Sequence, residues 1–269
     1  MTTAIDSQDV NMFIVTAIPA FNDNYIWALS THAQPDAVIV VDPGDAAPVL
    51  EWLQREQRSL HAILITHHHN DHTGGVAELS AHADIPVYGP HNSPFKGITH
   101  PLAAGDTLEL LGQQLNIQAV PAHTRDHISY FQPAGTAQLF CGDTLFLAGC
   151  GRLFEGSAKE MLSAMQYFSS LPDTTEVYCT HEYSLANLAF AASVEPENTD
   201  IRRVHQHCHE LRSQGLPTLP STIAQEKLIN PFMRTQVNTV VLAAEHFCGA
   251  ALRSEVEVLA ALREWKNQF

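Results

Sequence analysis

The chain has 269 residues and a formal net charge of -15, because 14 Lys and Arg stand against 29 Asp and Glu. Such an acidic surface repels phosphate backbones, which argues against nucleic acid as a partner. The 45% of apolar residues suffice for a sizeable core, and no stretch approaches the roughly 18 consecutive apolar residues of a membrane span. The chain opens Met1 to Asp6 without the basic start and apolar run of a secretory signal, so we expect a cytoplasmic protein.

Up to about residue 183, short apolar runs alternate with turn residues. Their β-branched and aromatic content, and the Gly, Pro, Asn and Asp that bound them, predict strands. The expected strands are 38–41, 62–66, 85–88, 115–120, 128–131, 138–141 and 176–179. Helices are expected at 46–57, 74–82 and 158–170. Many strands with a few interposed helices indicate sheets covered by helices.

From residue 184 the strand patterns disappear. Helices are expected at 185–194, 199–214, 237–250 and 254–265, punctuated by proline and glycine. We therefore expect a β-rich domain, 1–183, followed by an α-helical domain, 184–269. The five scattered cysteines show no C-x-x-C spacing, which indicates reduced, buried thiols rather than a disulfide framework.

The most informative segment is Thr-His-His-His-Asn-Asp-His at 66–72, directly after an expected strand. In extended backbone, side chains two residues apart point the same way, so His67 and His69 can bind one ion. As the chain turns out of the strand, Asp71 and His72 can reach a second ion. A polar surface turn is the alternative, but four histidines and an aspartate within six residues disfavour it. Imidazole and carboxylate ligands suit zinc and similar ions.

Two metal shells need further ligands, and three residues occupy comparable positions. His123, Asp143 and His181 each follow an expected strand. Each of them alone would more often be structural. Together with the histidine cluster they complete a ligand set for two ions.

These segments resemble the hydroxyacylglutathione hydrolases, or glyoxalase II, of the metallo-β-lactamase superfamily. The resemblance includes the H-x-H-x-D-H signature and extends over residues 20–27, 66–75, 141–146, 149–156, 180–183 and 230–234. It implies an α+β fold, namely an αββα metallo-β-lactamase sandwich with an α-helical C-terminal substrate-binding domain. It also implies two divalent metal ions, with zinc expected first; His and Asp ligands accept iron and manganese as well.

The resemblance further implies a role for each ligand. His67, His69 and His123 bind one metal, Asp71, His72 and His181 bind the other, and Asp143 bridges them. A hydroxide formed between the metals attacks the thioester carbonyl of S-(2-hydroxyacyl)glutathione, with Asp71 and Asp143 as the catalytic carboxylates. The expected substrate is S-D-lactoylglutathione, which yields glutathione and D-lactate in methylglyoxal degradation. The thiolate is a good leaving group, so no nucleophilic Ser or Cys is needed.

The same resemblance assigns the contacts to glutathione to Arg152, Phe154, Tyr183 and Arg234. Because glutathione is anionic, the two arginines are expected to supply local positive charge. Some family members carry Lys and Tyr where Arg152 and Phe154 stand. The stretch after Arg234 lacks a second basic residue, for which Lys227 is the candidate.

Two further departures concern the turn around His123. Ala122 and Asp126 stand where the family usually has Gly, although Asp tolerates a left-handed backbone better than most residues. His127 is expected to support this turn, and His68 to point away from its two neighbours.

The histidines of the C-terminal region form a separate group, with the members His205, His207 and His209. They are expected on a solvated helix face rather than at a third metal site, since only the first and last of them share a face.

The sequence disfavours four other functions. A persulfide dioxygenase, with a single iron and glutathione persulfide as substrate, would need neither the full second shell nor the Asn-Pro-Phe-Met-Arg segment. An RNA-processing nuclease is disfavoured by the charge of -15, and a β-lactamase by a carboxylate, Asp143, at the bridging position. A structural metal module would need closed coordination shells. We expect a monomer acting on a small glutathione thioester, without nucleic acid or membrane.

Overall fold

The structure is a computed structural model and describes residues 12–269. The chain forms two compact units, which are described separately below. The first comprises the chain up to Ala119 and Asp126–Gly142, and the second comprises Val120–Arg125 and Asp143–Phe269. Within the described residues, no helix has the length and apolar character needed to cross a bilayer. The N-terminal residues on which the absence of a secretory signal was predicted lie outside the described part.

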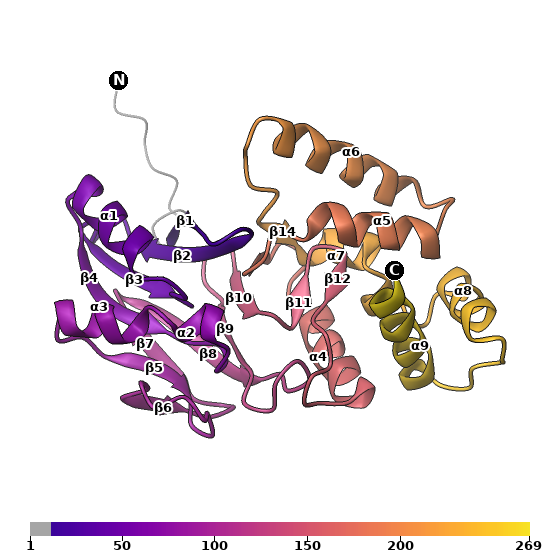
Figure 1. The fold of residues 1–269 in the computed structure, drawn as a ribbon, viewed down its shortest axis with the longest axis horizontal. Coiled ribbons are helices and arrows are strands. Elements are labelled where there is room, and N and C mark those ends of the chain that lie inside the picture. Colours follow the sequence, from indigo (N-terminus) through magenta and orange to yellow (C-terminus); the bar gives the residue numbers. More distant parts are fainter. Residues whose placement is uncertain (1–11) are drawn as a thin grey trace. The chain divides into compact units, whose positions relative to one another are not determined.

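The first unit contains a sheet with the strand order β1-β2-β3-β4-β5-β6 (Figure 1). Its strands are β1 (Ile14–Ala20), β2 (Asn24–Ser30), β3 (Ala37–Val41), β4 (Ser59–Leu64), β5 (Val87–Pro90) and β6 (His100–Leu102). The pairs β1–β2 and β2–β3 are antiparallel, whereas β3–β4, β4–β5 and β5–β6 are parallel. Parallel neighbours need a crossover connection, which contains α1 (Ala47–Glu56) between β3 and β4 and α3 (Val76–His82) between β4 and β5.

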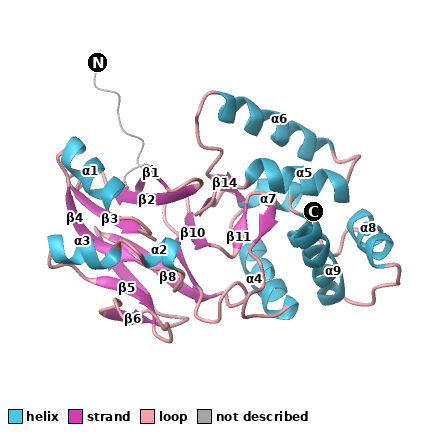
Figure 2. Cartoon of the chain, in the orientation of Figure 1, coloured by secondary structure: helices cyan, strands magenta, loops and turns pink. Residues whose placement is uncertain are grey.

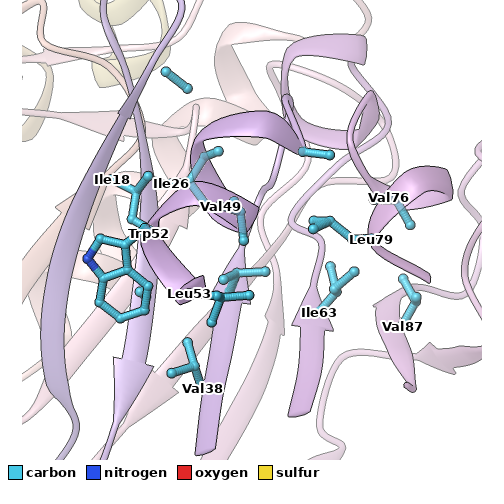
Figure 3. Close-up of a cluster of buried hydrophobic side chains, with 14 of the residues drawn as sticks. Ile18, Ile26, Val38, Val49, Trp52, Leu53, Ile63, Val76, Leu79 and Val87 are labelled. Carbon is cyan, nitrogen blue, oxygen red and sulfur yellow. The ribbon is translucent and has the colours of Figure 1, made fainter. Parts of the chain in front are cut away.

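One face of this sheet is covered by α1 and α3, and the resulting core is drawn in Figure 3. Val49, Trp52 and Leu53 of α1 are buried at helical spacing and pack in one cluster with Val38 and other side chains of the sheet. Val76 and Leu79 of α3 belong to the same cluster. This packing fixes the ends of β3 and β4, from which the candidate ligand loop emerges.

A second sheet of this unit has the order β10-β9-β8-β7. Its strands are β7 (Thr107–Leu110), β8 (Gln113–Ala119), β9 (Ile128–Gln132) and β10 (Gln138–Gly142), all paired antiparallel. Buried Tyr130 of β9 donates its hydroxyl to the carbonyl of Ile65, 2.7 Å away, just beyond β4. Burial raises the pKa of Tyr130 well above its ordinary value, so this donor keeps its proton. The two sheets of the unit are therefore joined close to the ligand loop.

The second unit is mainly helical (Figure 2). Its strands are β11 (Leu145–Phe146), β12 (Gly149–Cys150), β13 (Glu176–Cys179) and β14 (Ser221–Thr222). Its helices are α4 (Ala158–Ser170), α5 (Ser184–Val194), α6 (Thr199–Ser213), α7 (Ile223–Ile229), the 3-10 helix η2 (Pro231–Met233), α8 (Asn238–Cys248) and α9 (Glu255–Gln268). Side-chain caps define where several of them begin: Ser157 and Glu160 form a capping box at α4, and Asn198 caps α6.

The predicted strands and helices are confirmed to within a few residues, and the structure adds several short elements. Sequence analysis did not predict β1, β2, β6, β7, the hairpin β11–β12, β14, α2 (Asn70–Thr73), α7 or η2. Strand β6 contains a proline and only three residues, and α7 is a single seven-residue helix, so neither has a distinct periodicity. The predicted domain boundary at 183/184 coincides with the start of α5 and lies inside the second compact unit. The two-domain division stays a prediction.

The cysteines agree with the predicted reduced state, with one correction. All five are free, and four of them, Cys141, Cys150, Cys179 and Cys208, are buried. Cys248 is exposed at the end of α8, where it contacts only carbonyl groups of its own turn among the bonds described. It was predicted to be buried because free cysteine usually is, but α8 turns this side chain to solvent.

Candidate metal centre and substrate site

The first half of the candidate centre lies in the loop after β4, within the first unit. The loop leads into the short helix α2 (Asn70–Thr73), and His67 and His72 are fully buried. One ligand atom of His67 lies within 4.8 Å of ligand atoms of His69 and of His72, and Asp71 and His72 form another such pair. Four imidazole or carboxylate donors therefore converge within one loop, and this is the donor chemistry that zinc, iron and manganese accept.

Asp42, which directly follows β3, holds this loop in place through hydrogen bonds. Its carboxylate accepts hydrogen bonds from the backbone N–H and hydroxyl of Thr66, both at 2.7 Å, and from Nδ1 of His72 at 3.0 Å. A histidine that donates through Nδ1 has its Nε2 lone pair available for a metal. Asp42 is only 2% exposed and adopts a positive φ of 53°. The sequence argument missed this residue, although its place at a strand end beside the histidine cluster was a usable signal.

Two glycines after the loop are required by close packing. A Cβ atom at Gly74 would lie 2.6 Å from the carbonyl oxygen of Gly44, and one at Gly75 would lie 2.6 Å from the backbone nitrogen of Ala46. Larger residues at these positions would push the ligand loop away from the turn that holds Asp42.

A second group of candidate ligands lies in the second unit. His123, Asp143 and His181 are buried, and Oδ2 of Asp143 lies 3.5 Å from Nε2 of His123 and 3.2 Å from Nε2 of His181. The Nδ1 of His123 donates to the carbonyl of Arg152 at 2.9 Å, which leaves its Nε2 for the side facing Asp143. A Cβ at Gly151 would lie 2.0 Å from the carbonyl oxygen of Asp143, so only glycine fits there. One carboxylate thus stands between two imidazoles.

The two departures around His123 leave the turn intact. Neither Ala122 nor Asp126 has a positive φ, whereas Asp42 and Ala148 elsewhere in the described chain do. The carbonyl of Ala122 accepts from the backbone N–H of Gly156 at 2.9 Å. The backbone at these positions is therefore one that any L-residue can adopt.

Two predicted substrate residues of the second unit contact the histidines beside this carboxylate. The ring of Phe154, 62% exposed, lies 5.2 Å from the ring of His123. The ring of Tyr183 stacks on that of His181 with a centroid distance of 4.7 Å and an interplanar angle of 1°. Each histidine therefore has a partly exposed aromatic neighbour. Arg152 is exposed in the loop that precedes Phe154.

Arg234 has a different environment from the one its predicted role requires. It forms a bidentate ion pair with Glu195, in which Nε lies 2.8 Å from Oε2 and Nη2 lies 3.0 Å from Oε1. Burial alone would raise the pKa of Glu195, but hydrogen bonds from Arg234 and Thr239 and the Arg234 charge lower it below its ordinary value. Lys227, the proposed substitute, lies 2.6 Å from Asp173. Both cations are thus engaged with carboxylates of the protein itself.

A second basic pair, which the sequence argument missed, lies on α9. Arg263 donates to the carbonyl of Cys150 at 2.8 Å, and Lys266 donates to the carbonyl of Ala186 at 3.0 Å. Burial, together with the positive charges of Arg263 and Arg152, lowers the pKa of Lys266 to about 8. Three cations therefore influence one region of the second unit. The usable signal was the i, i+3 spacing of the two α9 residues, which places them on one helix face.

Glu226, a buried carboxyl group on α7, supports the hairpin next to this region. Its Oε2 accepts from the backbone N–H of Ala148 and from Nδ2 of Asn230, both at 2.9 Å, and Asn230 also donates to the carbonyls of Phe146 and Gly149. Phe146 packs edge-on against His181, with ring centroids 5.9 Å apart. Glu226 and Asn230 thereby fix the hairpin β11–β12, whose Phe146 contacts His181.

We expect the stability of the protein to report the ionisation of Glu226. Burial raises the pKa of Glu226 to about 7, although hydrogen bonds from Ser221, Asn230 and Ala148 act in the opposite direction. The folded pKa lies above the ordinary value of 4.5, so stability is lost as pH rises from 4.5 to about 7 and is level beyond. Glu226→Gln should remove this loss, which is on the order of 3 kcal/mol. Urea unfolding at several pH values measures it; the exposed Glu197→Gln is the control, and parallel pH curves for Glu226→Gln and wild type would contradict the expectation.

The chain is similar to known proteins over its whole described length. A family model described as the metallo-beta-lactamase superfamily matches residues 26–181, and one described as hydroxyacylglutathione hydrolase C-terminus matches residues 182–269. Proteins named hydroxyacylglutathione hydrolase from Nitrosomonas europaea and Aliivibrio fischeri are 47% and 49% identical to it. Each match covers 96% of this chain, and 97% and 100% of the relative, respectively.

Solved structures show the same fold at lower identity. ETHE1 from Myxococcus xanthus matches with a TM-score of 0.64 at 21% identity, over 94% of this chain and 91% of its own. TTHA1623 in a di-iron-bound form matches with a TM-score of 0.57 at 23% identity, over 81% of this chain and 99% of its own. The predicted metallo-β-lactamase sandwich with a helical C-terminal region is confirmed. With relatives nearly half identical over almost the whole chain, this protein belongs to the hydroxyacylglutathione hydrolase family of the metallo-β-lactamase superfamily.

Proposed function

We propose that the protein hydrolyses S-(2-hydroxyacyl)glutathione thioesters to glutathione and a 2-hydroxy acid. S-D-lactoylglutathione is the proposed substrate and D-lactate the product, as a step in methylglyoxal degradation. The observation that carries the proposal is the similarity to hydroxyacylglutathione hydrolases over 96% of the chain, combined with a full set of metal-binding side chains.

The proposed metal ligands are those that the family resemblance implies. His67, His69 and His123 would hold one ion, Asp71, His72 and His181 the other, and Asp143 would bridge them. The donor chemistry supports this assignment, as does the di-iron-bound form of the similarly folded TTHA1623. Two divalent cations, zinc first and iron or manganese as alternatives, would supply the Lewis acidity that ionises water near neutral pH. Seven ligands for two ions leave room for that water.

The protein's own groups would then orient the reaction. Asp71 would act as a catalytic carboxylate that orients the attacking water, and Asn24 restrains it by donating to its Oδ2 at 3.2 Å. Asp42 would hold His72 in the tautomer needed for ligation, through the 3.0 Å contact. The thiolate of glutathione leaves without protonation because a thiol pKa is about 8.5.

We propose that Arg152, Phe154 and Tyr183 form the binding site for glutathione. Arg263 and Lys266 are added to this site. The cations influence one another electrostatically, so they form a local positive region on a protein of net charge -15. That region suits the carboxylates of glutathione. Arg234, predicted as a direct contact, is proposed instead to neutralise Glu195 and fix the segment after η2.

Lys266 should make substrate binding depend on pH. Its pKa of about 8 means that the ammonium group, and with it the attraction for a carboxylate, is lost as pH rises through that value. We expect KM to rise above pH 8 with little change in kcat, and Lys266→Gln to raise KM about tenfold at neutral pH and flatten this rise. Steady-state kinetics across pH test this, with Lys159→Gln, an exposed α4 lysine, as the control. An unchanged KM in Lys266→Gln would contradict the assignment.

A persulfide dioxygenase is the rival activity, and oxygen consumption separates the two. Purified protein loaded with zinc or with iron is given S-D-lactoylglutathione or glutathione persulfide in a sealed oxygen electrode. We expect thioester loss without oxygen uptake. Oxygen uptake with the persulfide, and no loss of thioester with either metal, would refute thioester hydrolysis.

We also propose that the protein acts as a cytoplasmic monomer, without nucleic acid or membrane partners. The supporting observation is its acidic charge, which disfavours binding to phosphate backbones. Residues 184–269 are proposed as a helical substrate-binding domain that follows the sandwich of residues 1–183, because the α9 cations lie in it.

A further inference from the structure

The corner between β8 and β9 meets the ligand loop residue by residue within the first unit. The backbone N–H of Ile128 donates to the carbonyl of Thr66 at 2.9 Å. The ring of His127 stacks on that of His67, with centroids 4.6 Å apart and an interplanar angle of 17°. Oδ1 of Asp126 lies 2.9 Å from Nδ1 of His68. Residues 126–128 therefore contact residues 66–68 in antiparallel order.

The contact between Asp126 and His68 differs from the other two because both of its partners are side chains. Asp126 is 3% exposed, and a carboxylate so buried is costly unless it accepts strong hydrogen bonds. The side chain of His68 is 22% exposed, so this histidine is held at the rim rather than in the core. The Nδ1–H of His68 donates to Oδ1 of Asp126, which gives this buried oxygen a partner and fixes the ring.

Fixing His68 also fixes the two candidate ligands beside it. The ring plane of His68 makes angles of 76° and 71° with the ring planes of His67 and His69, so neither of these rings is parallel to it. His68 is joined to both of these residues by peptide bonds. Restraint of the middle side chain therefore restrains the directions in which His67 and His69 point.

We infer that Asp126 is a positioning residue for the metal site, acting through His68 on His67 and His69. The inference rests on the proposed function, since that function requires a metal at these histidines.

The test is zinc affinity, measured by titrating metal-free protein against a chromophoric chelator. We expect Asp126→Gly to weaken the affinity about 10- to 100-fold, the usual cost of losing an outer partner of a ligand set. Asp126→Asn keeps an oxygen that accepts from His68 and should lose only a few-fold. Asp106→Gly is the matched control: its carboxylate accepts from the backbone N–H of Ala103 at 2.7 Å in another turn of the same unit, and its loss should leave zinc affinity unchanged.

A double-mutant cycle with His68→Leu separates positioning from general stability. If Asp126 acts through His68, Asp126→Gly should cause little further loss of zinc affinity in the His68→Leu background. A purely structural role would lower the unfolding temperature of the metal-free protein equally in both backgrounds and leave zinc affinity intact. Asp126→Ser, whose hydroxyl is too short to reach His68, replaces Asp126→Gly if the latter does not fold.

The outcomes distinguish this inference from the proposed function. Wild-type protein that binds zinc and hydrolyses the thioester, with zinc affinity unchanged in Asp126→Gly, overturns the inference alone. An equal loss of affinity with and without His68 also overturns it. Wild-type protein that binds no metal overturns the proposed function and the inference together.

Discussion

Asp143→Ala is expected to lower the bound metal from about two ions per chain to one or fewer and to reduce kcat/KM by about a thousandfold. Oδ2 of Asp143 lies 3.5 Å and 3.2 Å from the Nε2 atoms of His123 and His181, a position from which one carboxylate can serve both ions. Alanine would remove the proposed bridging ligand and leave each imidazole without its negative neighbour. Elemental analysis of protein purified with excess metal measures the stoichiometry.

The control for this variant is Asp173→Ala in the same unit. Asp173 pairs with Lys227 at the surface and touches no candidate ligand among the contacts described, so its loss should change neither metal content nor kcat. If Asp143→Ala retained the wild-type stoichiometry, the bridging role would be rejected.

Asp42→Ala is expected to destabilise the metal-free protein by about 3–5 kcal/mol. The carboxylate accepts three hydrogen bonds, two from Thr66 and one from His72, and its removal leaves three buried donors without their acceptor. Alanine also tolerates the positive φ of 53° at this position poorly, because its Cβ clashes there. The free energy of unfolding from urea titrations gives the magnitude.

Asp42→Asn provides the graded comparison. Asparagine accepts the positive φ and keeps one oxygen, so it should cost less than Asp42→Ala, while still weakening the hold on His72. A loss below about 1 kcal/mol in Asp42→Ala would show that the loop does not depend on this carboxylate.

The histidine loop could be predicted from sequence because its members are adjacent in the chain. The alternation of side chains at a strand end places His67 and His69 together without any knowledge of the fold, and the structure keeps their rings 4.7 Å apart. His123, Asp143 and His181 could be nominated as strand-end residues. Their mutual arrangement depends on how hairpins and strands far apart in sequence pack, which periodicity does not encode.

The partners of the basic residues, in contrast, could not be predicted from the sequence. Arg234 was assigned a substrate contact from its segment alone, yet Glu195, 39 positions away in the chain, pairs with it. Lys266 and Arg152 influence each other only through tertiary packing of α9. Ion pairs of this kind depend on contacts between residues far apart in the chain. The sequence therefore identifies the charged residues but not their partners.

The most direct test of the central claim is hydrolysis of S-D-lactoylglutathione as metal-free protein is titrated with zinc. We predict negligible thioester loss without metal and a rate that rises with zinc and reaches its plateau at about two equivalents per chain. Absence of hydrolysis at every zinc loading, by folded protein that binds the metal, would contradict the account.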